Sequence, residues 1–421
     1  MINWQNVSWK KIIIIIGFII VTILLGYLLY YMFFKPAITP KTEKPTTVEL
    51  NQLPASKLGE QPGKVAPTGT EAVKPEPTVS ITKIPAPAGK KVDMIAQGGV
   101  TAVNTFGTEI SRDLTLDSSG DKSIVYNPGT GKFYSFDADG GKQLLSDKVY
   151  KDVKNISWSP QKEKAVLEFP DGTNVLYNFS EDKQITLPKD WADFSFNQAG
   201  NQLAFKDMSS KEEMRFLSIA NADGSGQKYL EPLGNQANNF KIDWSPNGQM
   251  VAQYKTGKDA STSKLFFLGQ NNENFKAITI NGYGLETQWA PSGKQLIYSA
   301  HSSKTEFKPE LYVVDANGTN IGQNNNSLKL NTWADKCTFA SDSVIYCAVP
   351  KELPYGANLT PAIADAIPDY IYKIDLENGV KSFIAEPEIA YTIDQLQVSA
   401  DEGTLFFTDK TTQALHSIKL K

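Results

Sequence analysis

Histidine, cysteine and arginine are scarce in this sequence of 421 residues, which contains two of each. Few histidines leave little scope for acid–base catalysis near neutral pH or for metal binding, because histidine titrates in that range and is the commonest metal ligand. The two arginines, Arg112 and Arg215, and a net charge of −4 argue against nucleic acid as a partner. Phosphate recognition depends on positive charge and on the arginine fork.

A long apolar run lies near the start of the chain. Residues 12–34 are 23 consecutive residues without a charge, enough to cross a bilayer as one tilted helix. No small-x-small cleavage motif follows, so we predict an uncleaved transmembrane anchor, with residues 1–11 as a short cytoplasmic N-terminus. The alternative is a buried core helix. Lysines flank both ends of the run almost equally, so charge alone does not orient the anchor.

The composition changes after the apolar run. Ten of the 23 prolines lie within residues 35–90, and no aromatic residue occurs between Phe34 and Phe106. Such a stretch buries too little apolar surface to offset the entropy cost of ordering it. We therefore predict a disordered, Pro/Thr/Lys-rich linker over residues 35–92. It is either a spacer that holds a domain away from the membrane or a linker whose length has no selected purpose.

One pattern repeats through residues 93–421. Its clearest copy, Lys241–Tyr254, has an alternating apolar stretch, the turn Ser-Pro-Asn-Gly and a second apolar stretch, which together predict a β-hairpin. Each copy has an apolar, usually aromatic, anchor before its turn, with spacings from 38 residues (158 to 196) to 59 residues (339 to 398). The blade anchors are Leu116, Trp158, Phe196, Trp244, Trp289, Phe339 and Val398. Four-stranded repeats of about 40 to 50 residues are typical of β-propeller blades.

Seven anchors predict an all-β, seven-bladed propeller, with six or eight blades as alternatives. We expect the anchors to be wedges between adjacent blades. The last repeat has room for only three strands, and residues 99–106 can supply the fourth, which closes the ring and removes its free edges. Outer turns such as Asp137–Gly140 resemble a calcium loop, but the later glutamate is missing, so they predict plain turns.

The hairpin motif is similar to that of the TolB-like, WD-like-repeat bacterial propellers, whose blades carry Trp-Ser-Pro-Asp-Gly. The matching stretches are Trp-Ser-Pro-Asn-Gly at 244–248, Trp-Ala-Pro-Ser-Gly at 289–293 and, in part, Trp-Ser-Pro at 158–160. The resemblance covers about residues 98–421 and implies the propeller fold. No N-terminal α/β domain of the TolB type is visible, so the partners of TolB are not carried over to this chain.

The two cysteines flank a predicted hairpin turn. Cys337 and Cys347 are expected to face each other on adjacent antiparallel strands, at a separation that a disulfide can bridge. We predict a disulfide, with reduced core cysteines as the alternative. Because disulfides persist in oxidising compartments, the pair favours a propeller on the extracytoplasmic side of the cell membrane.

The repeats are interrupted once, by residues 350–370 in the sixth unit. Long ordered loops are often functional, and Leu353, Pro354 and Tyr355 are candidates for a partner-contact patch. The alternative is a loop that only covers the end of the ring.

No motif for catalysis or cofactor binding accompanies these features. The chain has no nucleophile elbow, no His-Glu-x-x-His and no P-loop, and His301 and His416 fit surface or inter-blade positions. We predict no catalytic residue, no cofactor, no metal site and no enzyme. The leading interpretation is a membrane-anchored binding platform for a protein or envelope partner. A propeller-based hydrolase or lyase and a purely structural envelope scaffold are the alternatives.

Overall fold

A computed structural model describes residues 91–259, 261–271, 273 and 275–421, together with five positions between residues 18 and 25. The predicted N-terminus, anchor and linker (1–11, 12–34 and 35–92) therefore lie almost entirely outside the described residues. Within the described part of the chain, no helix has both the length and the apolar character that a membrane crossing requires.

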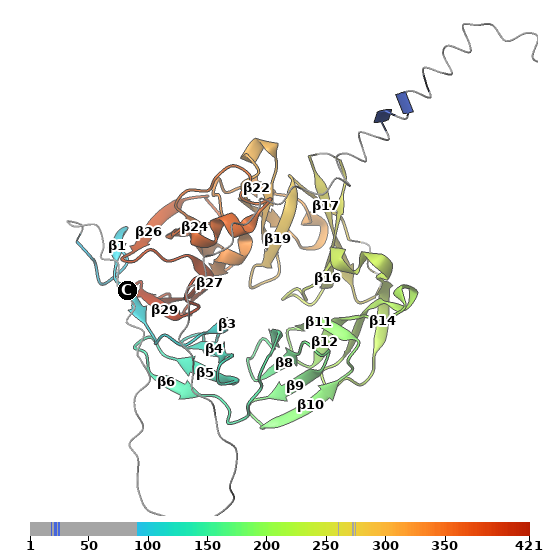
Figure 1. The fold of residues 1–421 in the computed structure, drawn as a ribbon, viewed down its shortest axis with the longest axis horizontal. Helices are drawn as coiled ribbons and strands as arrows, with labels where there is room; N and C mark the ends of the chain where they lie inside the picture. Colours follow the sequence, from blue (N-terminus) through green and yellow to red (C-terminus); the bar gives the residue numbers. More distant parts are fainter. Residues whose placement is uncertain are drawn as a thin grey trace, which may run out of the picture. The chain divides into compact units, whose positions relative to one another are not determined.

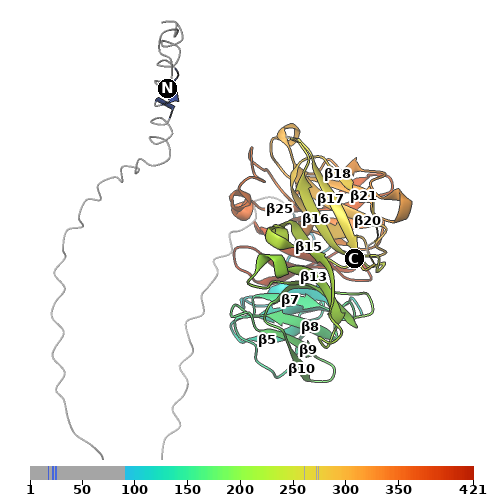
Figure 2. The same ribbon diagram turned by 90° about the vertical axis from the view of Figure 1, so that its right-hand side faces the viewer.

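The described chain folds into seven β-sheets arranged as blades around a common axis, which Figure 1 views end-on and Figure 2 from the side. Blade one contains β3 (Arg112–Leu116), β4 (Ser123–Asn127), β5 (Lys132–Phe136) and β6 (Lys142–Leu144), and blade two contains β7 (Asn155–Trp158), β8 (Lys164–Glu168), β9 (Asn174–Asn178) and β10 (Lys183–Leu187). Blade three contains β11 (Trp191–Phe196), β12 (Gln202–Asp207), β13 (Phe216–Asn221) and β14 (Lys228–Pro232), and blade four contains β15 (Phe240–Ile242), β16 (Met250–Gly257), β17 (Ser263–Gly269) and β18 (Ile278–Ile280). Blade five contains β19 (Tyr283–Trp289), β20 (Gln295–His301), β21 (Glu310–Asp315) and β22 (Asn326–Ser327). Blade six contains β23 (Cys337–Phe339), β24 (Val344–Pro350), β25 (Asp369–Asp375) and β26 (Lys381–Pro387). Blade seven contains β27 (Ile393–Val398), β28 (Thr404–Asp409) and β29 (Leu415–Lys419). The seven-bladed, all-β prediction is confirmed.

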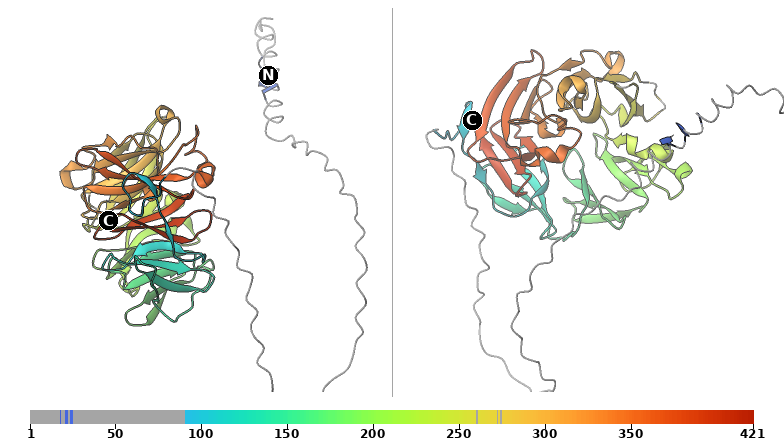
Figure 3. Two further views of the ribbon diagram at one scale, coloured as in Figure 1. Left: turned by 90° about the vertical axis from the view of Figure 1, so that its left-hand side faces the viewer. Right: turned by 45° about the horizontal axis from the view of Figure 1, so that its top comes forward.

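The ring closes with strands from the beginning of the repeat region, beside the C-terminal strands in Figure 3. β2 (Asn104–Thr105) is the fourth strand of blade seven, antiparallel to β29. β1 (Gly99–Thr101) instead joins blade six as a fifth strand, parallel to β26. The expectation that residues 99–106 act as one closing strand is therefore wrong for its first half, because the segment bridges two blades.

Short 3-10 helices connect some strands. They are η2 (Glu212–Met214), η3 (Gly234–Asn239), η4 (Ser303–Thr305), η5 (Gly318–Asn320), η6 (Ala334–Lys336) and η7 (Pro361–Ala366). The two that matter for the site are η6, which precedes the innermost strand of blade six, and η7, which lies in the long insertion of that blade.

Each junction between neighbouring blades has its own apolar core. Trp244 packs among residues of blades three and four, and Trp289 of blade five meets Phe267 of blade four with ring centroids 5.6 Å apart. Trp158 makes an edge-to-face contact with Phe133 of blade one. The strands carry apolar side chains on both faces, and these side chains fill the space between neighbouring sheets, as expected for blades that are covered on both sides.

The outer turns use their carboxylates locally. The Asp137 carboxylate accepts hydrogen bonds from the backbone N–H groups of Asp139 and Gly141, and Asp223 accepts from the N–H of Ser225 in the same way. These oxygens stabilise the turn backbone itself, which is the usual role of aspartate at such positions.

Candidate functional site

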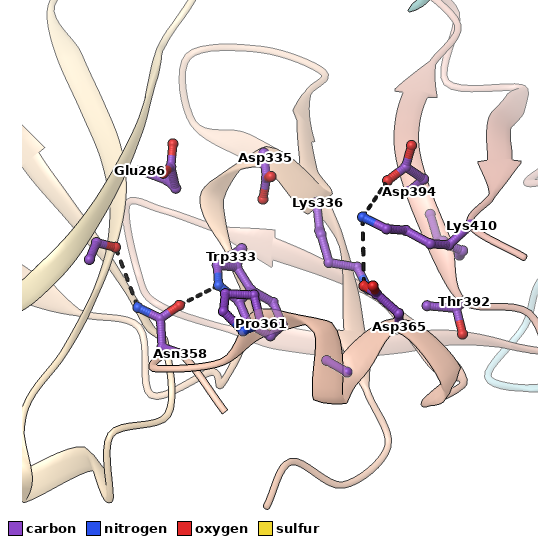
Figure 4. Close-up of a pocket in the computed structure, with 13 residues that line it drawn as sticks. Glu286, Trp333, Asp335, Lys336, Asn358, Pro361, Asp365, Thr392, Asp394 and Lys410 are labelled. Atoms are coloured by element: carbon purple, nitrogen blue, oxygen red, sulfur yellow. Dashed lines mark hydrogen bonds and ion pairs between the residues drawn. The ribbon is translucent and has the colours of Figure 1, made fainter. Parts of the chain in front are cut away.

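The candidate site is a cavity of about 290 Å³ at the end of the ring where the innermost strands begin, between blades five, six and seven. Figure 4 shows the residues that line it. They are Gly284, Glu286, Trp333, Asp335, Lys336, Asn358, Pro361, Ala364, Asp365, Thr392, Ile393, Asp394 and Lys410. Two smaller cavities share Glu286, Asp394 or Lys410 with it, so polar residues extend beyond the first cavity. We call the polar residues at this end of the innermost strands the belt.

Irregularities in the innermost strands place acidic residues on this belt. The pairing of β3, β11, β19 and β27 with the next strand shifts register near the start of each innermost strand. Asp113 and Asp193 adopt left-handed backbone there, with φ of 54° and 55°, and Gly284 does the same in β19. A bulge turns a side chain away from the regular alternation of the strand, which is how it can direct polar groups toward the centre of the ring.

Two carboxylates in the cavity have no ion-pair partner among the described residues. They are Glu286, in the middle of β19, and Asp335, in η6, and both residues are exposed. Burial raises the pKa of the Glu286 carboxyl, and the charge of Asp335 adds to this while Lys241 opposes it. Burial likewise raises the pKa of Asp335, against the attraction of Lys336. Both residues are nevertheless exposed, so each carboxylate faces the cavity and the solvent without a paired cation among the described residues.

Lys410 is the amine that neutralises the opposite wall of the cavity. Its Nζ lies 3.1 Å from Asp394 and 3.7 Å from Asp365, as the dashed lines in Figure 4 mark. Burial alone would lower the pKa of Lys410, but the hydrogen bond and charge of Asp394, with Asp365 and Asp335, outweigh burial and raise it. Lys410 is therefore already occupied, and it does not compensate the charge of Glu286.

The other lysine of the cavity is also occupied. Lys336 donates from Nζ to both carboxylate oxygens of Asp369, at 2.8 and 2.7 Å, and both side chains are buried. Asp369 also accepts from the backbone N–H of Ile393 at 2.7 Å, so this pair joins the start of β25 to blade seven. A buried pair with such additional hydrogen bonds is costly to break from one side, which makes it a fixed part of the wall.

Residues 351–368, which we call the lid, form one wall of the cavity and are pinned to blade five through Asn358. The Trp333 indole donates to Asn358 Oδ1, and Asn358 Nδ2 lies 2.6 Å from His301 Nδ1. Because an indole N–H only donates, it fixes the orientation of the amide, and Nδ1 of His301 must accept. The His301 imidazole is therefore neutral with its proton on Nε2. Burial lowers the pKa of His301, which also favours the neutral form.

The lid has a small core of its own, made of Trp333, Leu353, Ala357 and Ala364. Leu353 is only 6% exposed, so the expectation that it offers a contact surface is wrong: a leucine at this position anchors the lid instead. Pro354 and Tyr355 are exposed, and Tyr355 makes an edge contact with Phe307 of blade five. The N–H groups of Gly356 and Asn358 donate to carbonyl oxygens of the same blade-five loop.

The remaining predicted residues lie away from this cavity. Cys337 and Cys347 are directly paired on β23 and β24, joined by a disulfide and buried in the core between blades five and six. His416 is buried on β29, where its Nδ1 lies 3.0 Å from Thr105 Oγ1 of β2. Of the seven blade anchors, Leu116, Trp158 and Phe339 are half-buried, and the other four are buried.

Sequence reasoning overlooked the carboxylates of the belt, although a signal for them exists. Asp113, Asp193 and Glu286 each stand three residues before an anchor, and Asp335 and Asp394 stand four before one. A search for a polar residue at a fixed offset from the anchors would have found them. Within the described residues, no group of three or more His, Cys, Asp or Glu side chains is placed to hold a metal ion.

The chain was compared with known proteins. No protein-family model matches it, and no curated protein matches its sequence. A solved structure of oligogalacturonate lyase in complex with manganese is similar, with a TM-score of 0.56 and 12% identity over 81% of this chain and 98% of the lyase. The β-propeller domain of Myceliophteria thermophila Cps50 (Swd1) has a TM-score of 0.50 and 12% identity over 76% of this chain and all of that domain. At this identity the likeness shows the propeller fold alone.

Proposed function

We propose that this chain is a membrane-anchored, extracytoplasmic propeller that acts as a non-catalytic binding platform for a protein or envelope partner. The observation that carries the proposal is the cavity at the end of the ring, with its pinned lid and the carboxylates of Glu286 and Asp335, which have no ion-pair partner among the described residues. A cavity with a few fixed polar groups is the usual form of a binding site. A pinned lid keeps that site preorganised, which lowers the cost of binding.

The membrane part of the proposal rests on sequence. The uncharged run at residues 12–34 supports an anchor, and the Cys337–Cys347 disulfide supports an oxidising compartment for the propeller. The test is a protease added outside intact cells after the wall has been made permeable. We expect it to cut the linker and release the propeller. Protection of the propeller while a tag on the N-terminus is cut would place it on the cytoplasmic side instead.

The binding part is tested by photo-crosslinking in intact cells. A photoreactive amino acid replaces Tyr355 on the lid in one strain and Glu377 in another, an exposed turn residue between β25 and β26. We expect a discrete crosslinked adduct from position 355 and none from position 377. Equal adducts from both positions, or none from the lid, would contradict a platform centred on this end of the ring.

A further inference from the structure

An exposed apolar surface lies on the lid directly beside the cavity. Tyr355, Leu359 and Ile363 expose 68%, 59% and 49% of their surface, and we call these three residues the lid patch. They alternate along the chain with Asn358, Pro361 and Ala364, which line the cavity. Because consecutive Cα atoms are about 3.8 Å apart, patch and cavity lie within the span of one bound segment.

The lid fold itself explains why these side chains face outward. Leu353, Ala357 and Ala364 turn inward to Trp333 and fill the lid core, while Tyr355 rests its edge on Phe307. The lid patch thus stays exposed although a closed core lies directly beneath it. Three large apolar side chains exposed within nine residues of an ordered loop are a feature that interaction sites commonly share.

Charge decides what kind of partner fits. Glu286 and Asp335 carry negative charge into the cavity without an ion-pair partner among the described residues, whereas Lys336 and Lys410 are paired with Asp369 and with Asp394. A phosphate-rich or acidic partner would be repelled here, and a basic side chain would supply the missing counter-charge. The cavity of about 290 Å³ is large enough for one lysine or arginine side chain.

We infer that this surface binds a protein segment in which an aromatic or aliphatic residue lies next to a lysine or arginine. The apolar residue packs on the lid patch, and the basic side chain enters the cavity between Glu286 and Asp335. This inference rests on the proposed function and adds the chemistry of the partner to it. Tryptophan, tyrosine and arginine are the residue types that most often carry the binding energy of such interfaces.

The test is selection from a random phage-displayed peptide library on the full chain in detergent. We expect selected peptides to share a Lys or Arg within two residues of an aromatic or aliphatic residue. Their affinity is then measured by fluorescence anisotropy against the double variant Glu286→Gln/Asp335→Asn, the variant Tyr355→Ala and wild type. We expect the double variant to bind about tenfold or more weakly, since it removes both counter-charges, and Tyr355→Ala to bind more weakly as well.

A control variant removes the same total charge elsewhere. Asp121→Asn/Glu377→Gln alters two exposed turn carboxylates and should bind the peptides as wild type does. Melting curves verify that all variants are folded. Equal binding by wild type and the Glu286/Asp335 variant, selected peptides without basic residues, or no selected peptide would each overturn the inference. If lid adducts still form in cells in any of those cases, the platform function stands and only the partner chemistry is wrong.

Discussion

Gly284 is the position where the smallest change should release the lid. A Cβ at this residue would lie 2.4 Å from Asn358 Nδ2 and 2.6 Å from His301 Nδ1, closer than such atoms can approach. Gly284→Ala therefore forces the Asn358 amide away from its partners. It leaves the Trp333 indole and the His301 ring nitrogen without their hydrogen bonds to Asn358, and the bond to His301 is a side-chain contact that joins the lid to blade five.

The magnitude follows from those lost contacts. A buried polar group left unpaired costs about 1 to 3 kcal/mol, and two are affected, so we expect the free energy of lid opening to fall by about 2 to 6 kcal/mol. In hydrogen exchange, the Gly356 and Asn358 amides should then exchange roughly 30 to 20,000 times faster, provided that reclosing outpaces exchange. The amides of the blade strands should change much less.

Gly379→Ala is the matched control for this experiment. Gly379 lies in a turn of blade six with φ of 70°, close to the 67° of Gly284, but a Cβ at this residue would meet no atom within 4 Å. Both substitutions carry the same backbone strain of about 1 to 2 kcal/mol, but only Gly284→Ala displaces the side chain of Asn358. Equal lid exchange in the two variants would refute the role assigned to Asn358.

Three further predictions concern stability. Trp244→Ala should cost about 3 to 5 kcal/mol in denaturant unfolding, because it empties the core between blades three and four, whereas Trp244→Phe should retain most of the stability since the indole N–H has no partner among the described residues. Mass spectrometry of non-reduced peptides should show Cys337 linked to Cys347, and replacing both with Ala should cost about 2 to 3 kcal/mol at most, because the closed loop is short. Burial lowers the pKa of His416 to about 4, so the unfolded chain takes up a proton that the folded ring does not, and stability should fall by about 3 kcal/mol as the pH drops from about 6.5 to 4. Unfolding of wild type and His416→Gln at several pH values checks this, and parallel pH profiles would contradict it.

The sequence allowed the fold to be predicted because blades are built from local patterns. The Ser-Pro-Asn-Gly turn and Trp244 lie within one hairpin, so periodicity and turn residues specify them without knowledge of distant contacts. Ring closure was predicted from a count of strands, and the count could not reveal that β1 would pair in parallel with β26. Parallel pairing with a distant strand has no local signature in the sequence.

The site was harder to predict because its parts come from three blades. Glu286, Asp335 and Asp394 are far apart in sequence and meet only when the ring forms. The insertion was predicted to offer a candidate contact surface, but the split between Leu353 inside and Tyr355 outside depends on packing against Trp333. Composition alone does not say which apolar side chain of a loop turns inward.

The closure of the ring has a mechanical consequence. The chain enters the propeller through β1 and β2, which form three and two residue pairs respectively and are supported by flanking hydrogen bonds, such as those from Gly98 N–H to Ile384 and from Phe106 N–H to Leu415. A pull transmitted along the chain from its N-terminal side therefore acts on this segment first. Their detachment would leave blade seven with three strands and expose the edge of β29. The segment that ties the ring together is thus also the segment on which such a pull acts, so tension and ring opening are coupled through the attachment of β1 and β2.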